Sequence, residues 1–185
     1  MPESTRKSVK KQRHAATAEE NFSHIQPQAP ELEHAVLGAL MVDGEAYSLI
    51  SDILKPDSFY EHKNSLVFEA VQKLSFEQKP VDMLTVTNKL KELGELDEVG
   101  GSVYIAELCE NVTGAAHIVY HAAIIAQKAL ARQLISYTSR IQTNAFDETL
   151  DVNDVMQEAE ADLFELSKQN IKKDYTQIDP VINEA

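Results

Sequence analysis

Residues 115–146 read AAHIVYHAAIIAQKALARQLISYTSRIQTNAF, a stretch with neither glycine nor proline. Such an uninterrupted segment predicts a single helix of about 30 residues, about 45 Å long. Apolar residues recur along it at helical spacing and form a main stripe: Val119, Ala123, Ala126, Leu130, Leu134, Tyr137, Ile141 and Ala145. A second stripe accompanies the first half: Tyr120, Ile124, Ala131 and Ile135. An apolar face this wide indicates contact with two surfaces rather than one.

A second amphipathic helix comes after this stretch, beyond a short polar turn. The turn is DETLD, residues 147–151, and Asp151 is the expected N-cap. The helix after it carries one apolar stripe: Val152, Val155, Ala159, Leu163 and Leu166. The pair predicts an antiparallel hairpin. Since so thin a hairpin buries little surface by itself, it needs a partner, and the sequence leaves open whether that is its own head or another subunit.

Five shorter helices are expected before the hairpin, each with one apolar stripe and separated from the next by glycine or proline. Pro30 starts the first, Asp82 caps the fourth and Gly94 ends it, and the pair Gly100 and Gly101 precedes the fifth. The sequence therefore predicts an all-α fold, with a compact multi-helix head followed by a long antiparallel helical hairpin. We expect a disordered basic tail over 1–25, the head over 26–113, the hairpin over 114–170 and the start of a linker over 171–185.

The charge of the chain is unevenly distributed. The formal net charge is −13, yet residues 6–13, RKSVKKQR, contain five basic residues and no acidic one. An acidic body argues against a broad phosphate-binding face and favours protein partners. The basic tail leaves nucleic-acid binding open as an alternative to a solvated terminus. The single cysteine, the absence of a secretory signal and the lack of a membrane-spanning run together predict a soluble, cytoplasmic protein.

The sequence contains few candidate residues for a catalytic, phosphate-binding or metal-binding site. The glycine pair in VGGSVY, residues 99–104, has no lysine nearby, so it predicts a helix break rather than a phosphate loop. His117 and His121 have metal-capable spacing, but Ile118 stands where a zinc protease would have its base, and no third ligand is evident. Cys109 falls on a core stripe and is expected to be a small buried hydrophobe. We predict no catalytic, cofactor or metal site in this chain.

The last residues, 177–185, read QIDPVINEA and carry the signals of a helix that has only begun. Asp179 and Pro180 are a good N-cap and first helical residue, yet only about one turn comes after them. One turn is not stable by itself in water, because nucleation costs more than it returns. We therefore expect the chain to be a piece of a longer protein, joined to it through NIKKDYTQ (170–177), a polar linker without periodicity.

Several ordered motifs resemble one known family. They are PQAPELEHAVLGALMVD (27–43), DSFYEHKNSLVFEAV (57–71), KPVDMLTVTNKLKELGELDEVGGSVYIAELCENV (79–112) and YHAAIIAQKALARQLI (120–135). Over roughly residues 26–185 the chain resembles the N-terminal domain of bacterial DnaB-type replicative DNA helicases. The resemblance implies a linker helix near Asp179 that leads to a RecA-like motor domain. That motor would bind ATP, Mg²⁺ and DNA, so this fragment would hold no cofactor and would not itself be an enzyme, although its parent would be an ATP-dependent helicase.

The resemblance also implies partners. In this family the N-terminal domains dimerise through their hairpins, and three dimers form a collar on the hexameric ring; Leu130, Leu134, Tyr137 and Ile141 are the corresponding interface candidates. The collar docks the C-terminal helicase-binding domain of primase, for which the candidates are Tyr104, Ile135 and Ile141. Tyr104 lies off its helix's core stripe, which favours a partner contact, whereas Ile141 on the main stripe favours packing within the dimer. A helicase loader is a further implied partner, and no membrane contact is implied.

Overall fold

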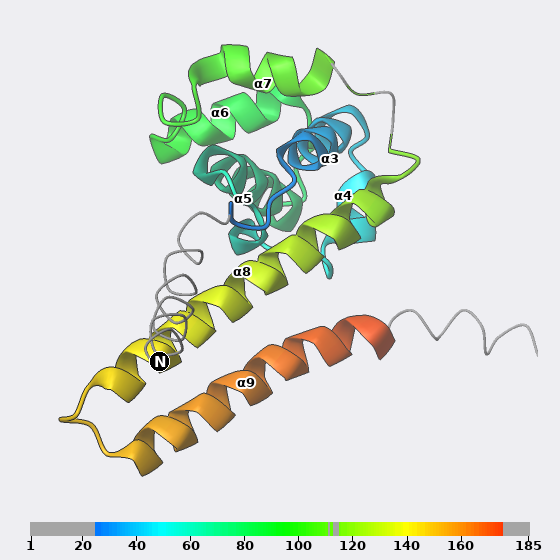
Figure 1. The fold of residues 1–185 in the computed structure, drawn as a ribbon. Helices are drawn as coiled ribbons and strands as arrows, with labels where there is room; N and C mark the ends of the chain where they lie inside the picture. The colour runs from blue at the N-terminus through cyan, green and yellow to red at the C-terminus, as the bar shows by residue number, and fades with distance from the viewer. Residues whose placement is uncertain (1–24, 111, 113–114, 176–185) are drawn as a thin grey trace, which may run out of the picture.

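The structure is a computed structural model that describes residues 25–110, 112 and 115–175. These residues form seven α-helices and one 3-10 turn, without a strand among them, so the all-α prediction is confirmed (Figure 1). In chain order they are α3 (Pro30–Val42), α4 (Ala46–Ile50), η2 (Pro56–Ser58), α5 (His62–Phe76), α6 (Met83–Leu93), α7 (Gly101–Glu110), α8 (Ile118–Phe146) and α9 (Val152–Tyr175). The predicted tail up to residue 24 and the helix start at Asp179 lie outside the described residues.

Local sequence signals set the helix ends where they were expected. Pro30 is the first residue of α3. The Asp82 carboxylate accepts hydrogen bonds from the backbone N–H groups of Leu84 and Thr85 at 2.8 and 2.9 Å, which satisfies two otherwise unpaired donors of α6. Gly94 ends α6 with a φ of 78°, a left-handed conformation that costs glycine little.

The head packs around α3, which contacts α5, α7 and α8 and lies at the centre of the core (Figure 1). The apolar stripe of α5, which consists of Val67, Ala70, Val71 and Leu74, is fully buried. The central residues of α3 are buried as well. The side chains that fill the core are Val36, Leu37, Leu40, Ile50, Leu54, Val67, Phe68, Val71, Leu90 and Ile105. Burial of this many aliphatic and aromatic groups supplies the main driving force for folding the head.

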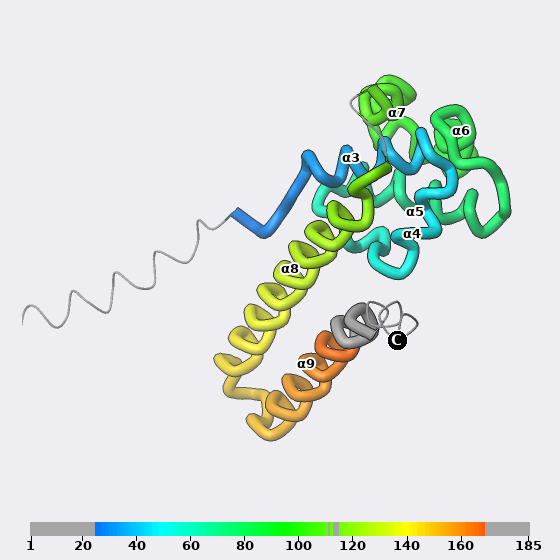
Figure 2. Tube along the Cα trace, turned by 90° about the vertical axis from the view of Figure 1, so that its right-hand side faces the viewer, coloured from blue at the N-terminus to red at the C-terminus, as the bar shows by residue number. Residues whose placement is uncertain are grey.

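Helix α8 joins the head to the hairpin. Its first half packs on α3, α4 and η2, while its second half extends beyond the head and runs beside α9 (Figures 1 and 2). Packing on two bodies agrees with the wide apolar face. Of the predicted main stripe, Ala126 is buried but Val119 and Ala123 are exposed. The other buried residues of α8 are Ile118, Ala122, Ile125 and Ala129, which lie on a neighbouring row. Apolar residues lie on more than one face of α8, and the head packs mainly against the row next to the predicted one.

Helix α9 returns antiparallel to α8, which confirms the predicted hairpin (Figure 2). It continues to Tyr175, so residues 170–175 of the expected linker segment are helical although their sequence shows no apolar periodicity. Val155, Ala159 and Leu166 are half-buried, whereas Val152 and Leu163 of the predicted stripe are exposed. Among the helices that the structure describes, none has both the length and the apolar character that crossing a membrane would require.

Candidate interaction surfaces

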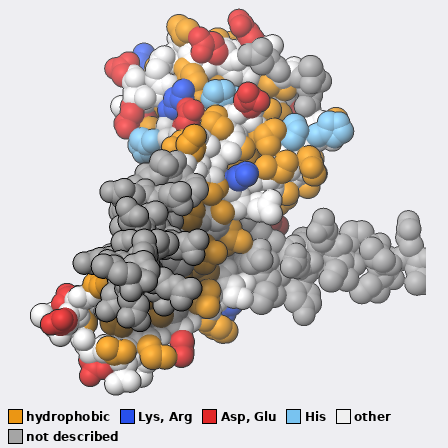
Figure 3. Space-filling model, in the orientation of Figure 1, with side chains coloured by type: hydrophobic (Ala, Val, Ile, Leu, Met, Phe, Trp, Pro, Cys, Tyr) orange, Lys and Arg blue, Asp and Glu red, His pale blue; other side chains and the backbone are white. Residues whose placement is uncertain are grey.

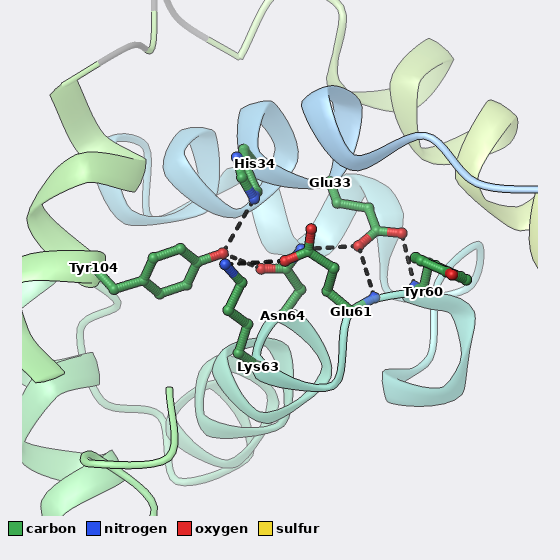
Figure 4. Close-up of polar contacts among 7 residues, drawn as sticks. All are labelled: Glu33, His34, Tyr60, Glu61, Lys63, Asn64 and Tyr104. Atoms are coloured by element: carbon green, nitrogen blue, oxygen red, sulfur yellow. Dashed lines mark hydrogen bonds and ion pairs between the residues drawn. The ribbon is translucent and has the colours of Figure 1, made fainter. Parts of the chain in front are cut away.

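A buried carboxylate organises the polar interior of the head. Glu33 of α3 is 1% exposed and accepts hydrogen bonds from the backbone N–H of Tyr60 at 2.7 Å and from the Asn64 side-chain amide at 2.8 Å (Figure 4). The N–H of Glu61 lies 3.5 Å from the same carboxylate. These donors surround the start of α5, where Glu61 makes no side-chain cap of its own. Glu33 therefore anchors the segment that leads into α5, together with the Asn64 side chain, from a neighbouring helix.

Tyr104 of α7 completes this cluster from the other side. Its hydroxyl donates to the Asn64 side-chain oxygen and lies 3.2 Å from Nε2 of His34 (Figure 4). The Lys63 ammonium sits 4.2 Å from the centre of its ring, a cation–π contact. Burial, followed by the charges of nearby glutamates, raises the pKa of Tyr104. The cluster holds α3, α5 and α7 together through polar contacts that are satisfied inside the head.

A shallow groove of about 370 Å³ lies above this cluster, between α3 and α7. The buried side chains of Tyr104 and Leu108 form its base, together with His34. The exposed carboxylates of Glu31 and Glu107 line its edge. The groove therefore combines an apolar base with a negatively charged rim.

Arg132 fixes the junction between the head and the hairpin. From α8 its guanidinium donates to the carbonyl of Pro27 and to the carbonyl of Ser58, each at 2.8 Å. The same group lies 5.6 Å from the ring centre of Tyr60. A planar guanidinium can serve two such acceptors at once, so Arg132 joins the segment before α3, the η2 turn and α8.

The hairpin has few contacts to hold it together within one chain. The Tyr137 hydroxyl donates to the carbonyl of Ala159, and Arg140 pairs with Asp162. Around these contacts large apolar side chains are exposed on both helices and the turn: Leu134, Ile135, Phe146, Leu150, Val152, Met156, Leu163 and Phe164. Figure 3 shows hydrophobic side chains at the surface along the hairpin. A run of exposed apolar side chains this long makes the hairpin a candidate surface for contact with another protein.

The predicted dimer-interface residues occupy different environments. Leu130 and Tyr137 are half-buried, and Leu134 is 46% exposed. Ile141 is half-buried in a second groove, of about 290 Å³, which α8 and α9 form with Val155 and Met156. The hairpin therefore brings Tyr137 and Ile141 against α9 of their own chain and leaves Leu134 at the surface.

Of the predicted primase-contact residues, the structure corrects the placement of Tyr104. Its helix position outside the apolar stripe predicted a surface side chain, but it is only 9% exposed. It faces a polar cluster rather than the solvent, which apolar periodicity does not detect. Ile135 is 44% exposed on α8 and is available for contact. Tyr104 lies in the head and Ile135 and Ile141 lie on the hairpin helix α8.

The other residues singled out in the sequence have ordinary surroundings. His117 is the N-cap residue of α8, and its ring centre lies 6.4 Å from that of His121. The described part of the chain contains no group of three or more His, Cys, Asp or Glu side chains that could hold a metal ion. Cys109 is half-buried, its Sγ lies 4.0 Å from Sδ of Met41, and burial raises the pKa of its thiol.

Sequence reasoning missed the buried polar residues and one glycine. Glu33 and Asn64 were not singled out because charged and amide side chains are rarely fully buried. Gly38 lies inside α3, where a Cβ would collide with the Leu108 carbonyl and the Val112 side chain. A glycine in the middle of an apolar helix was the available signal for this close approach of α3 and α7.

Comparison with known proteins identifies the family. The model of the DnaB-like helicase N-terminal domain matches residues 25–127. The chain is 37% identical over 161 residues to the replicative DNA helicase DnaB of Rhodothermus marinus, and 35% identical over 155 residues to the replicative DNA helicase DnaC of Bacillus subtilis. These alignments cover 87% and 80% of this chain, but the chain spans only 17% and 34% of those relatives.

Solved structures show the same fold. The N-terminal domain of the DnaB helicase from Mycobacterium tuberculosis is 31% identical, with a TM-score of 0.73, over 76% of this chain and 99% of that one. A second match, with a TM-score of 0.61 and 25% identity, comes from a structure of a DnaB-like replicative helicase and its interactions with primase; it covers 76% of this chain and 31% of that one. The match is thus to the N-terminal part of a replicative helicase and not to its motor. The chain belongs to the family of DnaB-like helicase N-terminal domains.

Proposed function

We propose that this chain is a non-catalytic collar domain, which pairs with a second copy through its hairpin and docks primase during DNA replication. The exposed apolar row of the hairpin carries the proposal. Within one chain α9 packs on α8, and side chains such as Leu134, Leu163 and Phe164 are left in solvent. A second hairpin would cover these side chains, which neither the head nor α9 of the same chain buries.

The family assignment supports the rest of the role. Three such pairs would form a collar on a hexameric, ATP-driven helicase in the cytoplasm, and ATP, Mg²⁺ and DNA would be bound by the motor domain of the parent protein. In this assignment 26–113 is the head, 114–170 the hairpin, and 171–185 begins the linker to that motor. A helicase loader is a further partner of the parent assembly.

Primase docking is proposed at the surface near the head–hairpin junction. A DnaB-like helicase of similar fold interacts with primase. Ile135 is the candidate that can touch a partner directly, because its side chain is exposed. Tyr104 would act from below the surface by holding His34 and Asn64 in place, and Ile141 by shaping the groove between α8 and α9.

Light scattering on a sizing column tests both parts, first with the chain alone and then with the C-terminal domain of the cognate primase. We expect a dimer or larger assembly that elutes together with the primase domain. Phe164→Ser should weaken self-association, while Phe76→Ser is the matched control, because Phe76 is a still more exposed phenylalanine in the head (79% against 61%). Ile135→Ser should reduce co-elution with primase.

Two outcomes would count against the proposal. A chain that stays monomeric at every concentration would mean that the apolar hairpin row does not pair. A stable dimer that ignores the primase domain would restrict the role to ring assembly, with docking left to other parts of the helicase.

A further inference from the structure

The groove between α3 and α7 has no assigned occupant, and its chemistry matches a segment of the same chain. We propose that the basic segment 6–13, RKSVKKQR, docks in this groove within its own chain. The segment carries five Lys and Arg residues, opposite in charge to the carboxylates of Glu31 and Glu107 at the rim of the groove. This contact is separate from dimerisation through the hairpin.

Charge complementarity is the first argument. Residues 26–113 contain 16 Asp and Glu, six Lys and no Arg, whereas the segment 6–13 contains five Lys and Arg and no acid. Within the described part of the chain, neither Glu31 nor Glu107 has a Lys or Arg partner at ion-pair distance. Opposite charges so arranged attract each other most at low ionic strength.

An ammonium group already lies against the Tyr104 ring, although Lys63 itself does not line the groove. Lys63 lies over the Tyr104 ring at 4.2 Å and pairs with Glu61 at 3.0 Å. Besides burial, the charges of Glu61, Glu33 and Glu107 raise the pKa of Tyr104, which agrees with the acidic surroundings of its ring. Aromatic rings and carboxylates together attract cationic side chains more strongly than either does alone.

Chain geometry permits the contact. Glu31 lies in the first turn of α3, six positions after Ile25, where the described residues begin. Residues 14–24 separate the basic segment from Ile25, and a chain of this length spans at most about 38 Å. A tether this short gives the segment an effective concentration in the millimolar range, so a weak contact is populated.

Paramagnetic relaxation on the full chain tests the proposal. A nitroxide is attached to Ser8→Cys in a Cys109→Ala background, and the amide signals of the ¹⁵N-labelled protein are recorded in low salt. We expect the signals of Glu31, Ala35 and Glu107 to lose at least about half of their intensity, and to recover near 1 M salt, where charges are screened beyond about 3 Å. The double variant Glu31→Gln with Glu107→Gln should abolish the effect.

A matched control removes the same charge elsewhere. Glu45→Gln with Glu148→Gln changes two exposed carboxylates outside the groove and should leave the broadening intact. A second sample mixes ¹⁴N chain that carries the nitroxide with ¹⁵N chain that carries none, and the groove signals should then keep their intensity. If they are broadened, the occupant is the tail of a second copy and the proposal is wrong. It is also wrong if groove signals keep full intensity in low salt. Tail signals that then shift on adding a single-stranded oligonucleotide would assign the segment to nucleic-acid binding.

Discussion

Asn64 in α5 donates its side-chain amide hydrogen to the Glu33 carboxylate in α3 at 2.8 Å, although both side chains are almost completely buried. The oxygen of the same amide accepts the Tyr104 hydroxyl from α7. The Asn64 amide thus joins three helices of the head. Its NH₂ group needs an acceptor and its oxygen needs a donor. Such a network is stabilising only while every member is satisfied.

Removing the carboxylate should destabilise the head. Glu33→Ala leaves the N–H of Tyr60 and the amide of Asn64 without an acceptor, and buried donors without acceptors are costly. We expect the free energy of unfolding to fall by about 3 kcal/mol, measured by urea denaturation. Glu107→Ala is the control and should change stability by less than about 0.5 kcal/mol, because this carboxylate is exposed on α7. Equal effects would show that the hydrogen bonds of Glu33 do not stabilise the head.

Tyr104 should make the stability depend on alkaline pH. Because its pKa is raised in the folded state, the unfolded chain loses the hydroxyl proton first. The stabilisation is therefore complete below the ordinary tyrosine pKa of about 10 and decreases as the pH rises above it.

Comparison of the wild type with Tyr104→Phe isolates this effect, since the other tyrosines are common to both proteins. We expect the variant to be about 1 kcal/mol less stable near pH 8, and the difference to shrink between about pH 10 and 11. The measurement is a series of denaturant unfolding curves across this range. A difference that stays constant with pH would contradict the raised pKa.

Gly38 should not tolerate a side chain. The added methyl of Gly38→Ala would overlap the backbone carbonyl of Leu108, which cannot move without shifting α7. We expect a net loss of about 1–3 kcal/mol by thermal or denaturant unfolding, although alanine favours a helix over glycine. Gly44→Ala is the matched control: its Cβ would lie 3.6 Å from the Val81 carbonyl, an ordinary contact, so stability should hardly change.

Arg132 should be needed to hold the head and the hairpin helix together. Arg132→Lys keeps the charge, but one ammonium cannot reproduce the planar fork that reaches Pro27 and Ser58. We expect exchange of the hydrogen-bonded amides of Ser58, Phe59 and Tyr60 to speed up at least about tenfold, equivalent to about 1.4 kcal/mol of local opening. Arg140→Lys, which alters an exposed ion pair within the hairpin, should leave these three amides protected. If hydrogen exchange is unchanged in Arg132→Lys, the guanidinium of Arg132 is not needed to hold the head and the hairpin helix together.

Much of the fold could be predicted from local signals because those signals act within one turn of the chain. Pro30, Asp82 and Gly94 begin or end helices through their own backbone geometry and hydrogen bonds. The absence of glycine and proline from 115–146 predicted the long helix. The segment 170–177 was the exception, since polar composition weakens a periodic signal without preventing a helix.

The sequence by itself determined that this protein is all-helical, where its main helices lie and that the long one meets two bodies. Only the tertiary structure decided which row of α8 faces the head: Ile118, Ala122, Ile125 and Ala129, rather than the row that includes Val119. Periodicity identifies apolar rows but not which one a neighbour covers. The same holds for Glu33 and Tyr104, because a polar side chain is buried only where distant helices bring its partners within hydrogen-bond distance.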